Sequence, residues 1–366
     1  MKFSLPREDL LPALQIVNGV VERRQTLPIL SYLLLSAEEN SLSLTATDME
    51  VELIAILKKK LDQKGEATLP ARKLLDICRT LPEEAVLNME ITGDKALLTS
   101  GKSRFTLASL PPQEFPTTEL SGKTWEFSIS EDRFKSLLDR TAFAMAQQDV
   151  RYYLNGLLLE LDKGKLRGVA TDGHRLALCE IDVDDAQDQK AQIIVPRKAV
   201  TELIRLLKDE KEEISVQLSG NHIHIDLGDL RFTSKLIDGK FPDYERVIPE
   251  AGQHPIIADK DAMRQSLTRA SILSNEKYRG VRILLEQGRL RALAHNPEQE
   301  EAEEEIEVQY DGKDLEIGFN VSYLLDALNI IKTSQVRISI SDPNSSCLIL
   351  PMDSSECKYV VMPMRL

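Results

Sequence analysis

The segment Leu166-Arg167-Gly168-Val169-Ala170-Thr171-Asp172 decides the fold, because the same pattern stands at two other places in the chain. Leu42-Ser43-Leu44-Thr45-Ala46-Thr47-Asp48 precedes it, and Leu290-Arg291-Ala292-Leu293-Ala294-His295-Asn296 follows it. Each segment alternates like a strand and ends at Asp or Asn, whose side chain can bond the next backbone groups in a turn. The three ends are 124 residues apart at both steps, about a third of the 366 residues.

Two further patterns recur at nearly this interval. A short strand leads into an amphipathic helix at Phe3-Ser4-Leu5, Phe127-Ser128-Ile129 and Ile256-Ile257-Ala258. A strand, a proline and a helix follow one another around Pro70 and Pro196, which are 126 residues apart. At the third position Asn320 replaces the proline and can cap the helix that follows.

These intervals predict three α+β domains over residues 1–124, 125–253 and 254–366, each with two helices and many short strands. A repeat of this length is too long for a solenoid unit, so each copy should have its own core. Three similar domains in a row suggest an arc, which can close into a ring by self-association.

The composition is that of a cytosolic globular protein. Hydrophobic residues make up 42% and charged residues 29%, and no stretch approaches the roughly 20 apolar residues of a membrane span. The N-terminus turns polar too early for a secretory signal. Four cysteines without CxxC spacing predict reduced thiols and neither a disulfide framework nor a zinc knuckle. The net charge of −13 argues against a tight, free-standing DNA binder but leaves a local basic surface possible.

Enzyme signatures are weak. Ser100-Gly101-Lys102-Ser103 ends like a phosphate-binding loop, but Ala96 stands where the opening glycine is required. His174 has no recognisable nucleophile beside it, and a catalytic role is the minor interpretation. His222 and His224 share one face of a strand, but without a third ligand a plain surface strand is favoured over a metal site. The sequence predicts no catalytic residue, no metal and no cofactor.

Basic residues recur along predicted helices. Arg72 and Arg79, like Lys198 and Arg205, are seven residues apart and so share a helix face. Each cluster alone is typical of a solvated face, whereas their repetition favours one shared binding surface. The segment 147–153 combines a charge with two tyrosines, which suits phosphate and base contacts but equally a strand entering a core.

Two segments near the end of the chain have alternative interpretations. The acidic run 297–307 is typical of a solvated segment, or it forms an ordered face for a basic partner. The last eight residues, 359–366, are either a final core strand or a methionine-rich groove for varied peptides.

Several longer sequence segments, spread over the whole chain, resemble a known family. They include Pro70-Ala71-Arg72-Lys73, the segment 148–156, Ala170-Thr171-Asp172-Gly173-His174-Arg175-Leu176, the segment 296–302 and the terminal 359–366. The chain resembles the beta subunits of bacterial DNA polymerase III, the replicative sliding clamps.

The resemblance implies a head-to-tail homodimer in which six domains form a ring, with helices lining the channel and antiparallel sheets outside. Such a ring encircles double-stranded DNA without sequence specificity and acts as a non-catalytic processivity factor in DNA replication. The implied partners are the polymerase III catalytic subunit, an ATP-dependent clamp loader, and other polymerases and repair proteins that carry clamp-binding peptides. Retention by encirclement reconciles the acidic charge with DNA, because weak phosphate contacts allow sliding.

The resemblance also implies the site residues. The implied DNA contacts are Arg24, Arg72, Gln148, Tyr152, Tyr153, Arg197 and Lys198. The implied peptide pocket comprises Leu154, Thr171, Gly173, His174, Arg175, Leu176, Pro242, Arg246, Val247, Val360, Val361, Met362, Pro363, Met364 and Arg365. The implied dimer interface comprises Lys73, Lys102, Arg104, Phe105, Ile272, Leu273, Glu300, Glu301, Glu303 and Glu304.

Two other classes of protein stay open at this point. A hydrolase or metal enzyme would be built around His174, His222 and His224, and stoichiometric zinc would support it. A scaffold that does not bind DNA would differ from a clamp in where its basic helix faces point.

Overall fold

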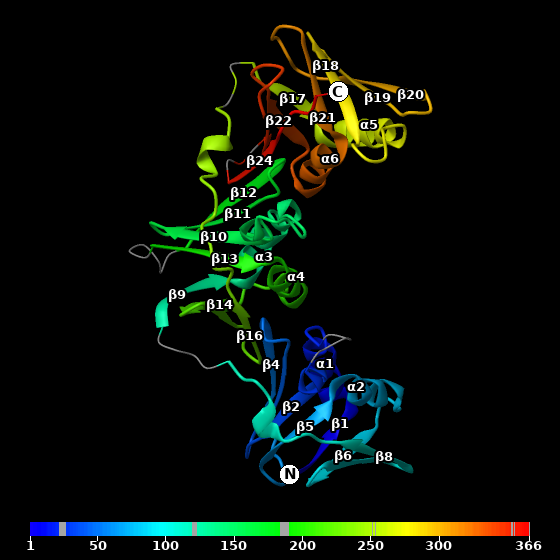
Figure 1. Cartoon of the computed structure of the whole chain (residues 1–366), viewed down its shortest axis with the longest axis vertical. Helices are drawn as coiled ribbons and strands as arrows, with labels where there is room; N and C mark the ends of the chain where they lie inside the picture. Colours follow the sequence, from blue (N-terminus) through cyan, green and yellow to red (C-terminus); the bar gives the residue numbers. More distant parts are fainter. Residues whose placement is uncertain are drawn as a thin grey trace. The chain divides into compact units, whose positions relative to one another are not determined.

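The computed structural model describes residues 1–21, 27–118, 123–183, 190–250, 252, 254–352, 354 and 356–365. Its elements are drawn in Figure 1. The chain forms two compact units, the first from Met1–Asp132 with Thr201–Leu236 and the second from Arg133–Val200 with Ile237–Leu366. The division differs from the predicted repeat because, as described below, each large sheet takes strands from two neighbouring repeats. The three domain boundaries stay a prediction.

The first unit contains two antiparallel sheets. Its strands are β1 (Lys2–Pro6), β2 (Tyr32–Ala37), β3 (Leu42–Thr47), β4 (Val51–Leu57), β5 (Gly65–Pro70), β6 (Val86–Thr92), β7 (Lys95–Ser100), β8 (Ser103–Ala108), β9 (Lys123–Ser130), β14 (Glu213–Ser219), β15 (His222–Asp226) and β16 (Leu230–Lys235). The smaller sheet has the order β1-β6-β7-β8, and the larger β5-β2-β3-β4-β16-β15-β14-β9.

The second unit also contains one eight-stranded and one four-stranded antiparallel sheet. Its strands are β10 (Gly156–Asp162), β11 (Lys165–Thr171), β12 (Arg175–Asp182), β13 (Lys190–Pro196), β17 (Ile256–Asp259), β18 (Gly280–Glu286), β19 (Arg289–His295), β20 (Glu301–Glu307), β21 (Leu315–Asn320), β22 (Gln335–Ser339), β23 (Cys347–Pro351) and β24 (Cys357–Val361). The larger sheet has the order β13-β10-β11-β12-β24-β23-β22-β17, and the smaller β20-β19-β18-β21.

The strand orders confirm the threefold repeat. In each large sheet, four strands of one repeat continue into four of the next, through the β4–β16 pair in one and the β12–β24 pair in the other. The two small sheets, within the described residues, are half-sheets of the same kind, and each ends at a strand with an unpaired side, β8 in one and β20 in the other.

Helices follow the strands where the sequence predicts them. They are α1 (Arg7–Val17), α2 (Ala71–Thr80), α3 (Glu131–Asp139), α4 (Arg197–Leu206), α5 (Lys260–Ile272) and α6 (Val321–Ile330). Helix α1 buries Leu10, Leu14 and Val17, spaced three or four residues apart, as an amphipathic helix requires. The Asn320 side chain accepts the Ser322 amide proton and so caps α6.

The recurring Asp and Asn residues form the predicted turns. Asp48 accepts the Val51 amide at 2.7 Å, and Asp172 accepts the amides of His174 and Arg175. Asn296 accepts the Glu300 amide at 2.9 Å. These bonds satisfy the backbone at each reversal and fix the register of the strands that follow.

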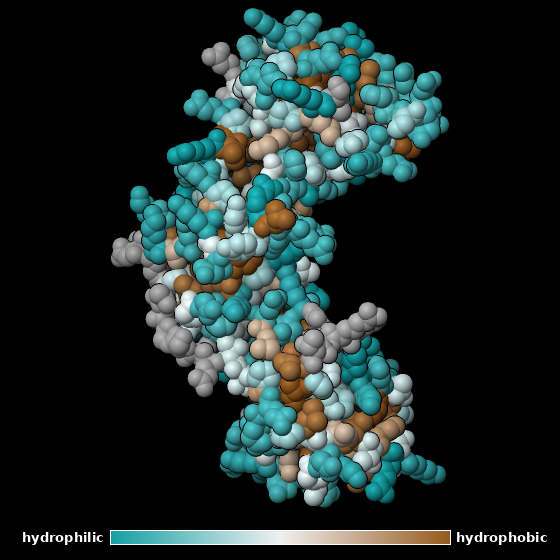
Figure 2. All heavy atoms as spheres, viewed as in Figure 1, coloured by the Kyte–Doolittle hydropathy of each residue, from teal (hydrophilic) through white to brown (hydrophobic). Residues whose placement is uncertain are grey.

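The interior is filled by apolar side chains from strands and helices. The largest fully buried side chains include those of Phe3, Phe127, Phe134, Phe232 and Phe319. The face of the molecule seen in Figure 2 is mainly hydrophilic, with apolar residues in separate patches. Among the described helices, none combines the length and apolar character of a membrane crossing.

The prediction of reduced cysteines is wrong for one pair. Cys179 on β12 and Cys357 on β24 are 178 residues apart, yet the antiparallel register places them directly opposite each other, and they form a disulfide. Their Cα atoms are 4.1 Å apart, a separation that only the strand pairing creates and that spacing in the sequence cannot reveal. Cys78 and Cys347 are buried free thiols.

Candidate functional site

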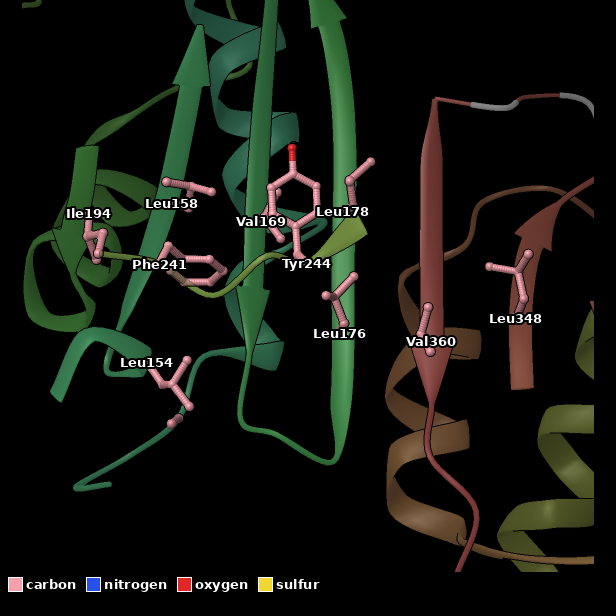
Figure 3. Packing of buried hydrophobic residues seen from close by; sticks show 11 residues of the cluster. Leu154, Leu158, Val169, Leu176, Leu178, Ile194, Phe241, Tyr244, Leu348 and Val360 are labelled. Carbon is pink, nitrogen blue, oxygen red and sulfur yellow. The ribbon is translucent and has the colours of Figure 1, made fainter. Parts of the chain in front are cut away.

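An apolar cluster covers the β12–β24 junction of the second unit. Its buried members are Ala146, Leu154, Leu158, Val169, Leu176, Leu178, Ile194, Phe241, Tyr244, Leu348 and Val360. Figure 3 shows these side chains on one side of the sheet, with Phe241 and Tyr244 on a loop that crosses the strands. Leu176 is paired with Val360, and Val360 with Leu348, so the cluster is continuous from one repeat to the next.

A buried polar contact anchors the crossing loop. The Tyr244 hydroxyl donates a hydrogen bond to Glu160, and both residues are less than a tenth exposed. Burial, followed by the bond to Glu160, raises the pKa of Tyr244 above its usual value, so the phenol stays protonated as a donor. The loop then continues into exposed Arg246 and Val247, and Arg246 pairs with Asp243 at 2.7 Å.

The His174 turn ties the C-terminus to this cluster. Gly173 adopts φ +87°, where a Cβ atom would lie 2.9 Å from the Arg151 guanidinium. Thr171 donates to the Arg175 carbonyl at 2.6 Å, and the Met362 amide donates to the His174 carbonyl at 2.9 Å. The positive φ favours glycine at this turn, whereas the nearby guanidinium is the end of a flexible side chain that can move aside.

Arg175 joins the turn to helix α6. Its guanidinium donates to Asp172 at 3.1 Å and to the Phe143 carbonyl at 2.9 Å, and it pairs with Asp326 of α6. It also lies 4.6 Å from the centroid of the Tyr323 ring, a cation–π distance. Arg175 thus holds the edge of the site rather than adding to its apolar floor.

Three of the residues predicted for the peptide pocket, Leu154, Leu176 and Val360, are buried members of the apolar cluster and form an apolar floor. Val361 is also buried, but as the next residue of β24 it lies on the opposite face of the sheet. His174, Pro242 and Val247 are exposed, and the pocket as a whole stays a prediction. Met362, Pro363 and Met364 are half-buried, and the Met364 amide donates to the Gly318 carbonyl at 2.7 Å. Arg365 is exposed. An apolar floor with half-exposed methionines beside it suits an apolar peptide side chain.

Of the six predicted DNA-contact residues that the structure describes, three are exposed and three are half-buried. Gln148 and Tyr152 are exposed beside the 3₁₀ turn Tyr152–Leu154, and the Tyr153 ring meets that of Tyr152 edge to face. The segment 147–153 is therefore a loop, not a strand entering a core.

The remaining predicted contacts lie at helix starts. Arg72 is exposed on α2, and its guanidinium donates to the Val21 carbonyl at 3.4 Å. Arg197 on α4 donates to the Met145 carbonyl at 2.9 Å, and Lys198 beside it is half-buried. Arg24 lies outside the described residues.

Apart from Lys73, the residues predicted for the dimer interface lie on or beside the two open sheet edges, and their role in an interface stays a prediction. Lys102 and Arg104 are exposed and Phe105 half-buried at β8, while Lys73 is exposed on α2. The acidic run is ordered as β20, where Glu301 and Glu303 are exposed and Glu304 accepts from Arg269 at 2.8 Å. Glu300, just before β20, is exposed and bonded to Asn296. Ile272 is 73% exposed at the end of α5, and Leu273 after it is half-buried.

The prediction of a plain surface strand is wrong for His224, which is only 9% exposed, whereas His222 beside it is half-buried. Their strand, β15, is an inner strand of the eight-stranded sheet. The two rings do share a face, with centroids 6.2 Å apart. Within the described ranges, no three His, Cys, Asp or Glu side chains converge to hold a metal.

Comparison with known proteins identifies the family. Family models of the DNA polymerase III beta subunit match residues 1–119 (N-terminal domain), 128–243 (central domain) and 245–365 (C-terminal domain). The beta sliding clamp of Pseudomonas aeruginosa is 53% identical, with both chains covered completely. The chain belongs to the beta sliding clamp family.

Solved clamps share the fold closely. The crystal structure of the DNA polymerase III beta subunit from Pseudomonas aeruginosa matches with a TM-score of 0.97 at 53% identity, over all of both chains. A sliding clamp from the same organism bound to griselimycin matches with a TM-score of 0.96 at 53% identity, again with both chains completely covered. As a sliding clamp, the protein is a non-catalytic processivity subunit of DNA polymerase III. The hypothesis of an enzyme built around His174 is therefore wrong.

Several residues of the clamp's apolar site were missed in the sequence. Leu178 and Leu348 extend the floor, Phe241 and Tyr244 cover it, and Tyr323 stacks on His174 with ring centroids 6.4 Å apart. The alternation of Leu176 and Leu178 was a usable signal for the floor. Nothing in the sequence placed α6 beside the His174 turn.

Proposed function

We propose that this clamp encircles double-stranded DNA as a head-to-tail homodimeric ring and tethers the replicative polymerase through the apolar site at the β12–β24 junction. The observation that carries the proposal is that apolar floor, which runs from one repeat to the next and lies beside half-buried C-terminal methionines. Peptides from the polymerase III catalytic subunit, other polymerases and repair proteins would insert an apolar side chain there.

The two half-sheets support the head-to-tail ring. Each large sheet consists of four strands from one repeat and four from the next, whereas β8 and β20 have an unpaired side within the described residues. Joining β8 of one copy to β20 of another would complete an eight-stranded sheet like the two inside the chain. Such a heterologous contact closes into a ring when two copies satisfy both pairs of edges.

The charges at these edges favour the same pairing. Lys102 and Arg104 lie at β8, and Glu301 and Glu303 are exposed on β20. Opposite charges across an interface speed encounter and fix register, while like edges would repel. Exposed Ile272 and half-buried Phe105 would supply the apolar part of the interface.

Weak DNA contact is consistent with the net charge of −13. The proposed contacts Gln148 and Tyr152 are exposed on a loop, and Arg72 and Arg197 stand at helix starts. Scattered contacts of this kind would let the ring slide, because each strong phosphate contact adds friction and salt dependence. We further propose that an ATP-driven clamp loader opens the ring and that the protein works in the cytoplasm.

Deleting residues 362–366 tests the peptide site. We expect the truncated clamp to lose stimulation of polymerase III on primed circular DNA, because the half-buried Met362 and Met364 are removed, while its mass stays that of a dimer. Met49→Ala is the matched control, since it removes an exposed methionine from a turn of the other large sheet. Full stimulation by the truncated clamp would refute the assignment of the site.

Charge reversal tests the ring. The double variant Lys102→Glu and Arg104→Glu should shift the protein from dimer to monomer, measured by light scattering during gel filtration. Adding Glu301→Lys and Glu303→Lys should restore the dimer, because opposite charges again face each other across the edges. A dimer that tolerates the first pair of changes would contradict the proposed interface.

A further inference from the structure

The first unit has a polar counterpart of the apolar site. Leu176 lies four residues after the turn residue Asp172, and Glu52 lies four after Asp48. Glu52 on β4 is paired with Thr233 on β16, just as Leu176 on β12 is paired with Val360 on β24.

One strand further along, His224 is paired with Thr233, as Leu348 is with Val360. The same three positions therefore carry Glu, Thr and His in one large sheet and Leu, Val and Leu in the other.

A cavity of 330 Å³ lies over these polar positions. Its lining includes Glu52, Thr118, Gln217, His224 and Thr233. Glu52 is only 5% exposed and accepts one hydrogen bond, at 3.1 Å, from the Thr118 amide. No ion pair reaches this carboxylate from the described residues, and burial raises its pKa above the usual value, against the smaller effect of the Thr118 bond.

His224 adds an unused polar atom. Its Nδ1 is 2.8 Å from the Thr233 hydroxyl, whereas its Nε2 has no hydrogen-bond partner among the described residues. Burial, followed by the charge of His222, lowers the pKa of His224 to about 4, so the ring is neutral at pH 7 and does not repel a cation. A buried ring nitrogen without a partner costs free energy that a ligand could recover.

The other charges around the cavity leave it acidic. Asp226 and Arg231, which also line it, lie 3.7 Å apart and offset each other. Glu126 accepts hydrogen bonds from Ser215 and Gln217 on the neighbouring strand. The Glu52 carboxylate thus dominates the interior of the cavity.

We propose that this cavity is a second docking site of the clamp, which takes the basic side chain, arginine or lysine, of a partner protein segment. A guanidinium or ammonium group would pair with Glu52 and satisfy a carboxylate that is otherwise buried with one donor. The apolar site receives an apolar side chain at the equivalent position, so the two sites would read different residues of their partners. This inference stands apart from the proposed function, because it does not depend on where the polymerase binds.

Histidine NMR on the full-length protein tests the proposal. The chain has five histidines, so selective labelling of their ring carbons gives few signals, and His224→Gln identifies that of His224. The probe is the peptide acetyl-Ala-Ala-Arg-Ala-Ala-amide, and the control peptide replaces arginine by citrulline, its neutral analogue. We expect the arginine peptide to shift the His224 signal with a dissociation constant of about 1 mM and to leave the His174 signal unchanged.

Glu52→Gln is the matched variant, since it keeps the shape of the side chain and removes the charge. This variant should bind the arginine peptide about tenfold or more weakly than wild type does. Its thermal melting curve checks that the fold persists. Equal binding of the citrulline peptide would show a neutral ligand and overturn the proposal. So would a His224 signal that does not move, or one that moves equally in the Glu52→Gln clamp. Equal shifts from spermidine and the arginine peptide would assign the cavity to free polyamines and overturn a protein segment as its ligand.

Discussion

Acid should destabilise the first unit through His224, which is 9% exposed inside an eight-stranded sheet. Burial, with a smaller contribution from His222, lowers its pKa from 6.5 to about 4. The unfolded chain therefore binds the proton at a higher pH than the folded chain does. The free energy of unfolding falls as the pH drops from about 6.5 towards 4, and the loss is complete below the folded pKa.

The size of this loss follows from the two pKa values. They differ by about 2.5, which corresponds to about 3 kcal/mol once the pH lies below 4. Between pH 7 and pH 5, about 2 kcal/mol of this should already be lost. Glu52, with its raised pKa, contributes in the opposite direction, since its contribution to stability falls as the pH rises above about 4.5.

Urea unfolding of wild type and His224→Gln at pH 7 and pH 5 isolates the histidine. Trp125 is the single tryptophan of the chain and lies on β9 of the same sheet as His224, so its fluorescence reports this unit. Groups other than His224, Glu52 included, cancel when the pH-dependent loss of the variant is subtracted from that of wild type. We expect a difference of about 2 kcal/mol. Equal losses in the two proteins would refute the reasoning.

Two further changes probe the second unit. Tyr244→Phe should lower the free energy of unfolding by about 1–3 kcal/mol, because Glu160 stays buried without its donor, and a urea midpoint equal to wild type would contradict this. Cys357→Ser should lower the melting temperature in the absence of reductant, since it removes the disulfide to Cys179, and should match wild type in dithiothreitol. A difference that persists in reductant would instead point to packing of the side chain.

The fold was predictable from the sequence because short local patterns, such as alternating strands that end at a turn residue, recur once in each repeat. Asp48, Asp172 and Asn296 end alternating segments at equal intervals, and each makes the backbone bonds that such a turn needs. The joining of repeats into eight-stranded sheets was not predictable, since pairing between β4 and β16 depends on contacts far apart in the chain. The Cys179–Cys357 disulfide was not predictable for the same reason, since it joins two strands far apart in the chain.

The candidate site was only partly predictable without a family resemblance. Two features of the site are visible in the sequence: the alternation of apolar residues that predicts a buried Leu176, and the methionines near the C-terminus. The anchoring of Tyr244 by Glu160, 84 residues away, and the link from Arg175 to Asp326 are not, because they join distant segments. The burial of His224 was misjudged because a strand inside a large sheet and an edge strand can share the same alternation.

The continuity of the large sheets has a consequence for how the proposed ring would part. Within each chain, the β4–β16 and β12–β24 junctions are held by backbone ladders and by the covalent chain, and the second also by a disulfide. In the proposed ring, the contacts between copies would lack any covalent link, and symmetry would make them equal in strength. Breaking either one would make a gate and leave the other as its hinge. Opening the ring would expose the edge strands β8 and β20, which carry exposed charges. These charges would hinder edge-to-edge aggregation of the open clamp with other sheets before it binds DNA.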